Sequence, residues 1–219
     1  MHFVWLGAVI SHYKHKGTSM FTAHMFGLLY HPKSEWSFIR REKYSLVQVY
    51  LRYAIFLAMI PPVSLFIGTT QFGWSIAGGD VIKLSTESAL PIAILFYLAL
   101  LVGLAFVSYC TFWMERTFGA DASFERCLIF TTFTATPMFL SGFIGLLPIL
   151  WLDVFVVLGA VCYSLYLLYV GIPIFMNIPE ERGFIFASSI LTVGLCSLVG
   201  LMAITVILWG SGLGPQFLN

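Results

Sequence analysis

The stretch Tyr163-Ser-Leu-Tyr-Leu-Leu-Tyr-Val-Gly-Ile-Pro173 decides the fold of this chain. It lies in an apolar run that only a membrane-spanning helix explains, yet it carries tyrosines at positions 163, 166 and 169. In a helix of about 3.6 residues per turn, tyrosines at this spacing share one face. A phenol inside a membrane needs a hydrogen-bond partner from the protein, because lipid offers none. We therefore expect this face to be buried against another helix.

The composition places nearly all of the chain in a membrane. Of its 219 residues, 59% are hydrophobic and only 10% are charged, whereas a soluble domain carries about 25% charged residues. The net charge of +1 does not favour a nucleic-acid partner. The four cysteines include no Cys-x-x-Cys pair and lie in or beside apolar runs, so we expect packing residues rather than a disulfide or metal site.

Apolar runs predict an all-α membrane protein with five transmembrane helices. We expect spans at about residues 44–67, 90–114, 127–147, 149–172 and 184–209. Residues 1–43 form an N-terminal segment before the five-helix domain of residues 44–210, and residues 211–219 form a short external tail. Helix breakers are expected to kink the first span or end it early, to interrupt the third and to end the fourth. These breakers are Pro61, Pro62, Pro137, Gly171 and Pro173.

The basic residues predict the orientation of the chain. If the N-terminus is cytoplasmic, all eleven Lys and Arg residues except Lys83 fall on the cytoplasmic side. An excess of basic residues on that side is the usual signature of topology. We therefore expect a cytoplasmic N-terminus, an external C-terminus and a multi-pass location in the cytoplasmic (inner) membrane.

The N-terminal segment predicts an interfacial amphipathic helix, with Ser34 as its N-cap and Trp36 and Ile39 on its apolar side. Its basic residues have two interpretations, a site for anionic lipid or a partner, and an anchor that only fixes topology. This basic cluster consists of Arg40, Arg41 and Lys43. All five histidines precede residue 32, but without a third ligand they do not predict a metal site.

The third and fourth spans are expected to form a hairpin about Pro148, which brings polar side chains together between them. This places Tyr163 near Thr134 and Tyr166 near Thr131. The predicted polar face comprises Thr131, Thr134, Thr136, Tyr163 and Tyr166. It has two interpretations, hydrogen bonds that hold the helices together or a path for a small neutral or lipidic solute.

Small residues recur at every fourth position of the fifth span, at Ser188, Thr192, Cys196 and Gly200. This spacing is typical of helices that approach closely in lipid, within one chain or between copies.

Several classes of function lack their sequence signals. No histidine lies in a predicted span, and no carboxylate lies at mid-depth. The chain has no phosphate-binding loop and no Gly-x-Ser-x-Gly motif. We therefore expect neither an enzyme nor a cofactor, and a proton-coupled pump lacks the intramembrane ionisable group it needs.

Five motifs, in order, resemble the Yip-type family, the Ypt/Rab-interacting membrane proteins. They are Phe38-Ile-Arg-Arg-Glu42, Phe66-Ile-Gly-Thr-Thr-Gln71, Thr136-Pro137-Met-Phe-Leu-Ser-Gly142, Tyr166-Leu-Leu-Tyr169-Val-Gly171-Ile-Pro173 and Val206-Ile-Leu-Trp-Gly210. The resemblance runs from about Met25 to Gly210 and is strongest to the small bacterial inner-membrane members.

This resemblance implies five spans and a cytoplasmic N-terminus. Eukaryotic members bind prenylated Rab GTPases through a longer N-terminal region with an Asp-Leu-Tyr-Gly-Pro-type motif, which this chain lacks. Rab binding is therefore not expected. The prediction is a non-catalytic protein that organises membrane or binds partners, namely lipids, a second copy or another membrane protein. The alternative is a transporter or channel that uses the predicted polar face.

Overall fold

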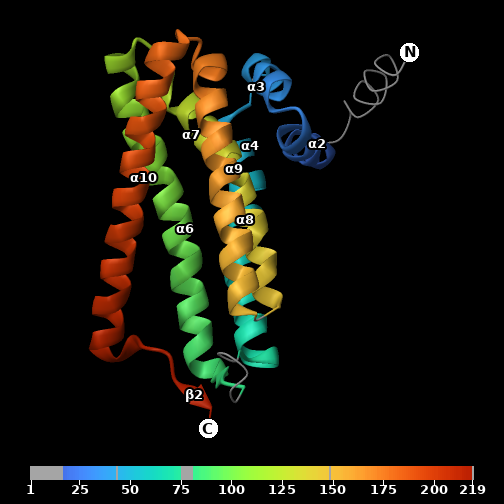
Figure 1. The fold of residues 1–219 in the computed structure, drawn as a ribbon, viewed down its shortest axis with the longest axis vertical. Coiled ribbons are helices and arrows are strands. Elements are labelled where there is room, and N and C mark those ends of the chain that lie inside the picture. Colours follow the sequence, from blue (N-terminus) through green and yellow to red (C-terminus); the bar gives the residue numbers. More distant parts are fainter. Residues whose placement is uncertain (1–16, 43, 75–80, 148, 219) are drawn as a thin grey trace.

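The computed structural model describes residues 17–42, 44–74, 81–147 and 149–218, and its long axis follows a bundle of helices (Figure 1). Five helices are long and apolar enough to cross a membrane. They are Leu46–Phe72, Thr86–Phe118, Phe124–Leu146, Leu150–Met176 and Glu180–Gly212. The predicted all-α fold with five spans is confirmed.

The first span consists of α4 (Leu46–Val49), a π-helical turn (Tyr50–Ala54), α5 (Ile55–Ile67) and a second π-helical turn (Gly68–Phe72). It begins at Ser45, which forms a capping box with Gln48. Pro61 and Pro62 lie inside α5 and do not end it. Neighbouring helices make such prolines tolerable in a membrane, and Pro61 packs directly on Gly142 of the third span.

The second span is α6 (Thr86–Glu115), which continues into a 3₁₀ turn at Arg116–Phe118. The third span comprises α7 (Phe124–Thr134), α8 (Thr136–Ser141) and a 3₁₀ segment at Gly142–Leu146. Its helix is interrupted at Ala135, two residues before Pro137, where ψ is −8°. Half of the most apolar stretch of this span is buried, so the third span forms the centre of the bundle.

The fourth span is α9 (Leu150–Met176), and the fifth is α10 (Glu180–Leu208) with a π-helical turn at Trp209–Leu213. The prediction that Gly171 and Pro173 end the fourth span is wrong, because α9 passes through both residues. The helix ends instead at Asn177, which adopts the left-handed conformation with φ of 57°. Asparagine tolerates this conformation, so it serves as the C-cap.

Both ends of the bundle carry short additional elements. At one end, β1 (Lys83–Leu84) pairs antiparallel with β2 (Phe217–Leu218), so the C-terminal tail is tied to the segment before α6. At the other end, α2 (Gly17–Tyr30) and α3 (Pro32–Arg41) lie beside the bundle, with α2 farther from that end than α3 (Figure 1). We call this the basic end, because it includes Arg40, Arg41, Arg116, Arg126 and Arg182.

α6 and α10 are peripheral, since only 6% of the most apolar stretch of each is buried. The predicted small-residue stripe of α10 does not pack within the chain along its whole length. Ser188 bonds to Tyr169, but Cys196 is exposed and a Cβ on Gly200 would meet nothing within 4 Å. The stripe lacks packing partners there because the half of α10 away from the basic end diverges from α9 (Figure 1).

Candidate functional site

Trp36 attaches α3 to the bundle. Its indole is completely buried between two aromatic rings, with centroids 4.8 Å from Phe130 and 5.7 Å from Phe175. The indole lies directly over Gly171 of α9, where an added Cβ would come within 2.6 Å of Trp36 Cε2. Gly171 therefore makes room for the indole. The apolar side of the predicted interfacial helix faces protein at Trp36 and at the buried Ile39.

Two arginines bind the C-terminal end of α9. Arg40 Nη1 donates to Ile174 O at 3.2 Å and to Asn177 Oδ1 at 2.9 Å. Arg126 Nη2 donates to Phe175 O at 3.4 Å, and its guanidinium lies 5.5 Å from the centre of the Phe175 ring. A helix C-terminus carries unpaired carbonyls and partial negative charge, so cations stabilise it. Arg40 thus fixes α3 at a defined position on α9.

Tyr163 joins α9 to the last turn of α2. Its hydroxyl donates to Leu28 O and Leu29 O, both at 2.9 Å. Carbonyls in the last turn of a helix have no partner within that helix. The phenol therefore supplies a C-terminal cap for α2. Tyr163 does not hydrogen-bond to Thr134, because its hydroxyl bonds to α2 and the Thr134 hydroxyl bonds to Phe130 O of its own helix.

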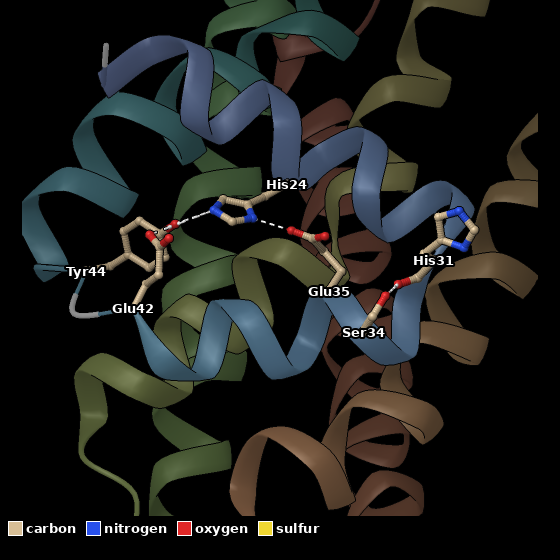
Figure 2. A network of polar contacts seen from close by, with 6 residues as sticks. All are labelled: His24, His31, Ser34, Glu35, Glu42 and Tyr44. Carbon is tan, nitrogen blue, oxygen red and sulfur yellow. Dashed lines mark hydrogen bonds and ion pairs between the residues drawn. The ribbon is translucent and has the colours of Figure 1, made fainter. Parts of the chain in front are cut away.

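A hydrogen-bonded network connects α2, α3 and the start of the first span (Figure 2). His24 bonds to Glu35 through Nδ1 and to the hydroxyl of Tyr44 through Nε2. Glu42 Oε2 lies 3.9 Å from His24 Nε2. Because a carboxylate only accepts, Nδ1 carries the proton toward Glu35. A Cβ on Gly27 would clash with Glu35 Oε2, so Gly27 lets the carboxylate reach α2.

Tyr44 is buried, and its phenol is held in the neutral form. Burial, followed by hydrogen bonding and charge repulsion from Glu42, raises the pKa of Tyr44 well above its usual value of about 10. A phenol of this kind is a weak base and a poor nucleophile. The network is therefore suited to holding helices together.

Ser34 does not cap α3. The helix begins at Pro32 with His31 at the N-cap position. Ser34 Oγ donates to His31 O at 3.0 Å (Figure 2), whereas an N-cap side chain accepts from the backbone. The prediction failed because the helix begins three residues earlier, at Pro32, as proline favours the first helical position.

The exposed side of α3 bears a depression of about 340 Å³ lined by Ser37, Arg40 and Arg41. Arg41 is exposed, while Arg40 is held by its bonds to α9. The structure thus places two of the three residues of the predicted basic cluster around one hollow. Lys43, the third, lies outside the described residues.

Two carboxylates, one buried and one half-buried, accept hydrogen bonds at the basic end. Glu115 is 1% exposed, and it accepts from Ala122 N at 3.0 Å and faces Arg116 Nε at 3.7 Å. Glu125 accepts from Leu46 N at the start of the first span. Both carboxylates satisfy backbone N–H groups, which is a structural role. Within the described ranges, no group of three His, Cys, Asp or Glu side chains is arranged to hold a metal ion.

The predicted polar face is not assembled as one network. Thr131 and Thr134 donate to carbonyls of their own helix, at Cys127 and Phe130, both at 2.8 Å. Such back-bonds satisfy a hydroxyl without a second helix. Thr136 lies 2.7 Å from the hydroxyl of Tyr53 in the first span. Tyr166 is 46% exposed and meets Tyr163 only through its ring, with centroids 5.7 Å apart.

These five residues also line neither of two hollows in the described part of the chain. One pocket is the hollow on α3, and the other holds only about 20 Å³ between the first span and α6. The geometry therefore favours hydrogen bonds between helices at Thr136 and Tyr163. Their partners, Tyr53 and the last turn of α2, differ from those predicted for a hairpin of the third and fourth spans.

Sequence reasoning missed the hairpin of α2 and α3 and the network of His24, Glu35 and Tyr44. One signal was available. His24 is the only ionisable residue apart from the terminal Tyr30 in the apolar stretch Gly17–Tyr30, and an ionisable side chain in such a stretch needs an internal partner. The identity of that partner depends on how α2 and α3 pack, which the spacing alone does not give.

Comparison with known proteins agrees with this architecture. Residues 26–201 match the Yip1 domain. Inner membrane protein YohC of Escherichia coli strain K12 is 42% identical over 190 residues, covering 87% of this chain and 97% of the relative. YohC of E. coli O6:H1 matches to the same extent. No solved structure matches. The chain belongs to the Yip1 domain family and is a multi-pass protein of the inner membrane.

Proposed function

We propose that this protein is non-catalytic and organises the inner membrane by holding anionic phospholipid headgroups at its basic end. The observation that carries the proposal is the hollow on α3 lined by Ser37, Arg40 and Arg41. Guanidinium groups bind phosphate through paired N–H donors, and a serine hydroxyl adds a further donor. The hollow thus offers the donors that a phosphodiester needs.

The position of α3 supports a lipid ligand. α3 lies beside the bundle near its basic end, where the headgroups of one leaflet would surround it (Figure 1). A basic side chain near an anionic membrane surface contributes about 1 kcal/mol. Arg40 is already ordered by Ile174 and Asn177, so less side-chain entropy is lost when a headgroup binds.

The absence of catalysis is supported by the way the polar groups of this end are used. Glu115 and Glu125 accept from backbone N–H groups, and His24 is held between Glu35 and Tyr44. A general base or nucleophile must instead face a substrate. The alternative of a solute path has less support, because Thr131 and Thr134 bond to their own helix and Tyr163 caps α2.

The test is the effect of lipid on stability. A ligand that binds only the folded state raises stability by about 2.7 kcal/mol at 100 times its dissociation constant. The full chain in neutral detergent should gain a higher unfolding midpoint from phosphatidylglycerol than from phosphatidylcholine. Arg41→Gln should lose most of this difference. Lys33→Gln is the matched control, because it removes the same charge from the same helix outside the hollow. Equal losses in both variants would contradict a defined site.

A further inference from the structure

The last turn of α2 lies beside the middle of α9. The hydroxyl of Tyr163 contacts the last turn of α2, and Tyr163 stands thirteen residues from each end of α9, since 163 − 150 and 176 − 163 both equal 13. That is about 20 Å of helix in either direction. A hydrocarbon layer about 30 Å thick, crossed by α9, necessarily contains this midpoint.

The composition of α2 fits such a depth. Gly17–Tyr30 contains no Asp, Glu, Lys or Arg. The ring of its histidine, His24, is buried, and both nitrogens bond within the protein, to Glu35 and Tyr44. The carbonyls of Leu28 and Leu29 obtain from Tyr163 the hydrogen bonds that water would give in solution. A helix end in lipid needs such internal partners.

The outer side of α2 carries aromatic side chains. Phe26 is 55% exposed and Tyr30 is 75% exposed. Exposed basic residues belong to α3, which lies nearer the basic end, at Lys33, Arg40 and Arg41. α3 carries the polar residues and lies nearer the basic end, whereas α2 is apolar and lies deeper. This order matches the gradient from headgroups to acyl chains. With 14 residues, α2 is too short to span a bilayer.

We propose that α2 is an in-plane membrane helix, embedded in the leaflet of the basic end, whose Phe26–Tyr30 side contacts lipid acyl chains. Among the described residues, it adds to that leaflet a helix that has no counterpart at the other end of the bundle (Figure 1). The inference goes beyond headgroup binding by α3 and does not depend on it.

Spin-label accessibility tests this placement. In the full chain in vesicles, with the four native cysteines replaced, a nitroxide at Phe26→Cys is compared with two reference positions. Leu158→Cys reports lipid, since Leu158 is 56% exposed on α9, and Glu181→Cys, at an exposed residue in the first turn of α10, reports the aqueous surface. The label at residue 26 should collide with oxygen and be protected from a water-soluble nickel chelate, as at residue 158. Access to the chelate as at residue 181, or to neither reagent, would overturn the proposal.

A second measurement keeps the native cysteines, so it does not depend on the folding of the cysteine-free variant. Benzoylphenylalanine at position 26 of the full chain is irradiated in vesicles, and the products are analysed by mass. Lipid adducts are expected. Cross-linked dimers in place of lipid adducts would show that a second copy covers this side of α2, and products without lipid would place it in water. Neither result depends on anionic headgroups, so failure here is distinct from failure of the proposed function.

Discussion

The indole of Trp36 occupies the space that a side chain at residue 171 would need, because a Cβ built on Gly171 lies 2.6 Å from Trp36 Cε2. This contact joins α3, which precedes the first span, to the fourth span near the basic end of the bundle. It makes the N-terminal hairpin of α2 and α3 part of the folded unit. The stability of that unit is therefore expected to depend on Gly171, even though alanine has a higher helix propensity than glycine.

Gly171→Ala should destabilise the protein by about 1–3 kcal/mol, the usual cost of overpacking a well-packed contact. The measurement is the unfolding midpoint in detergent. Gly194→Ala is the matched control, since a Cβ there meets nothing within 4 Å, and it should be neutral or slightly stabilising. Trp36→Phe should partly rescue Gly171→Ala by vacating the contact. Equal effects of the two alanine variants would contradict the packing account.

Tyr163→Phe should remove the C-terminal cap of α2 and cost about 1 kcal/mol, as measured intramembrane hydrogen bonds do. The loss should be local, so hydrogen exchange should accelerate in α2 and stay unchanged in α10. Tyr166→Phe is the control, because Tyr166 is half exposed and meets Tyr163 only through its ring. Faster exchange in both variants would argue against a specific cap.

Alkaline pH should weaken the network around Tyr44. Its pKa is raised in the folded state, so the folded protein retains the phenolic proton more tightly than the unfolded chain does. The stability contributed by this group is complete below about pH 10, the unfolded value, and is lost progressively above it. Tyr44→Phe should remove this part of the pH dependence. The control Tyr30→Phe, at an exposed tyrosine, should keep the full slope of the unfolding midpoint against pH.

Substitutions of Arg40 and Arg41 should have different effects on the free energy of unfolding. Arg40→Gln removes the bonds to Ile174 and Asn177 at the C-terminus of α9 and should cost up to about 1 kcal/mol. Arg41→Gln should leave the unfolding midpoint in lipid-free detergent unchanged within about 0.5 kcal/mol, as surface substitutions usually do. A large loss from Arg41→Gln without lipid would assign Arg41 a structural role and remove it as a probe of the hollow.

The five spans could be predicted from the sequence because each depends on a local apolar run longer than a bilayer requires. The role of Gly171 could not, since it depends on Trp36, far away in the chain, while α9 continues through Pro173 to Asn177. The hydroxyls of Thr131 and Thr134 belong to the predicted polar face, where they can bond within their own helix or join the phenols of the fourth span. Back-bonds within their own helix satisfied them, and pattern reasoning has no means of choosing between the two outcomes.

The basic cluster was found at Arg40 and Arg41 because charge beside an apolar run is visible in sequence. Its division into a residue that fixes α3 and a residue that stays exposed was not visible. That division depends on where α9 ends, and Asn177 rather than Gly171 or Pro173 sets that end.

The most direct test of the central claim is native mass spectrometry of the full chain released from mixed phosphatidylglycerol and phosphatidylcholine. The account predicts that the wild-type protein and Lys33→Gln retain phosphatidylglycerol in preference, while Arg41→Gln retains it several-fold less. Equal retention of both lipids by the wild-type protein, or undiminished retention by Arg41→Gln, would contradict a headgroup site on α3.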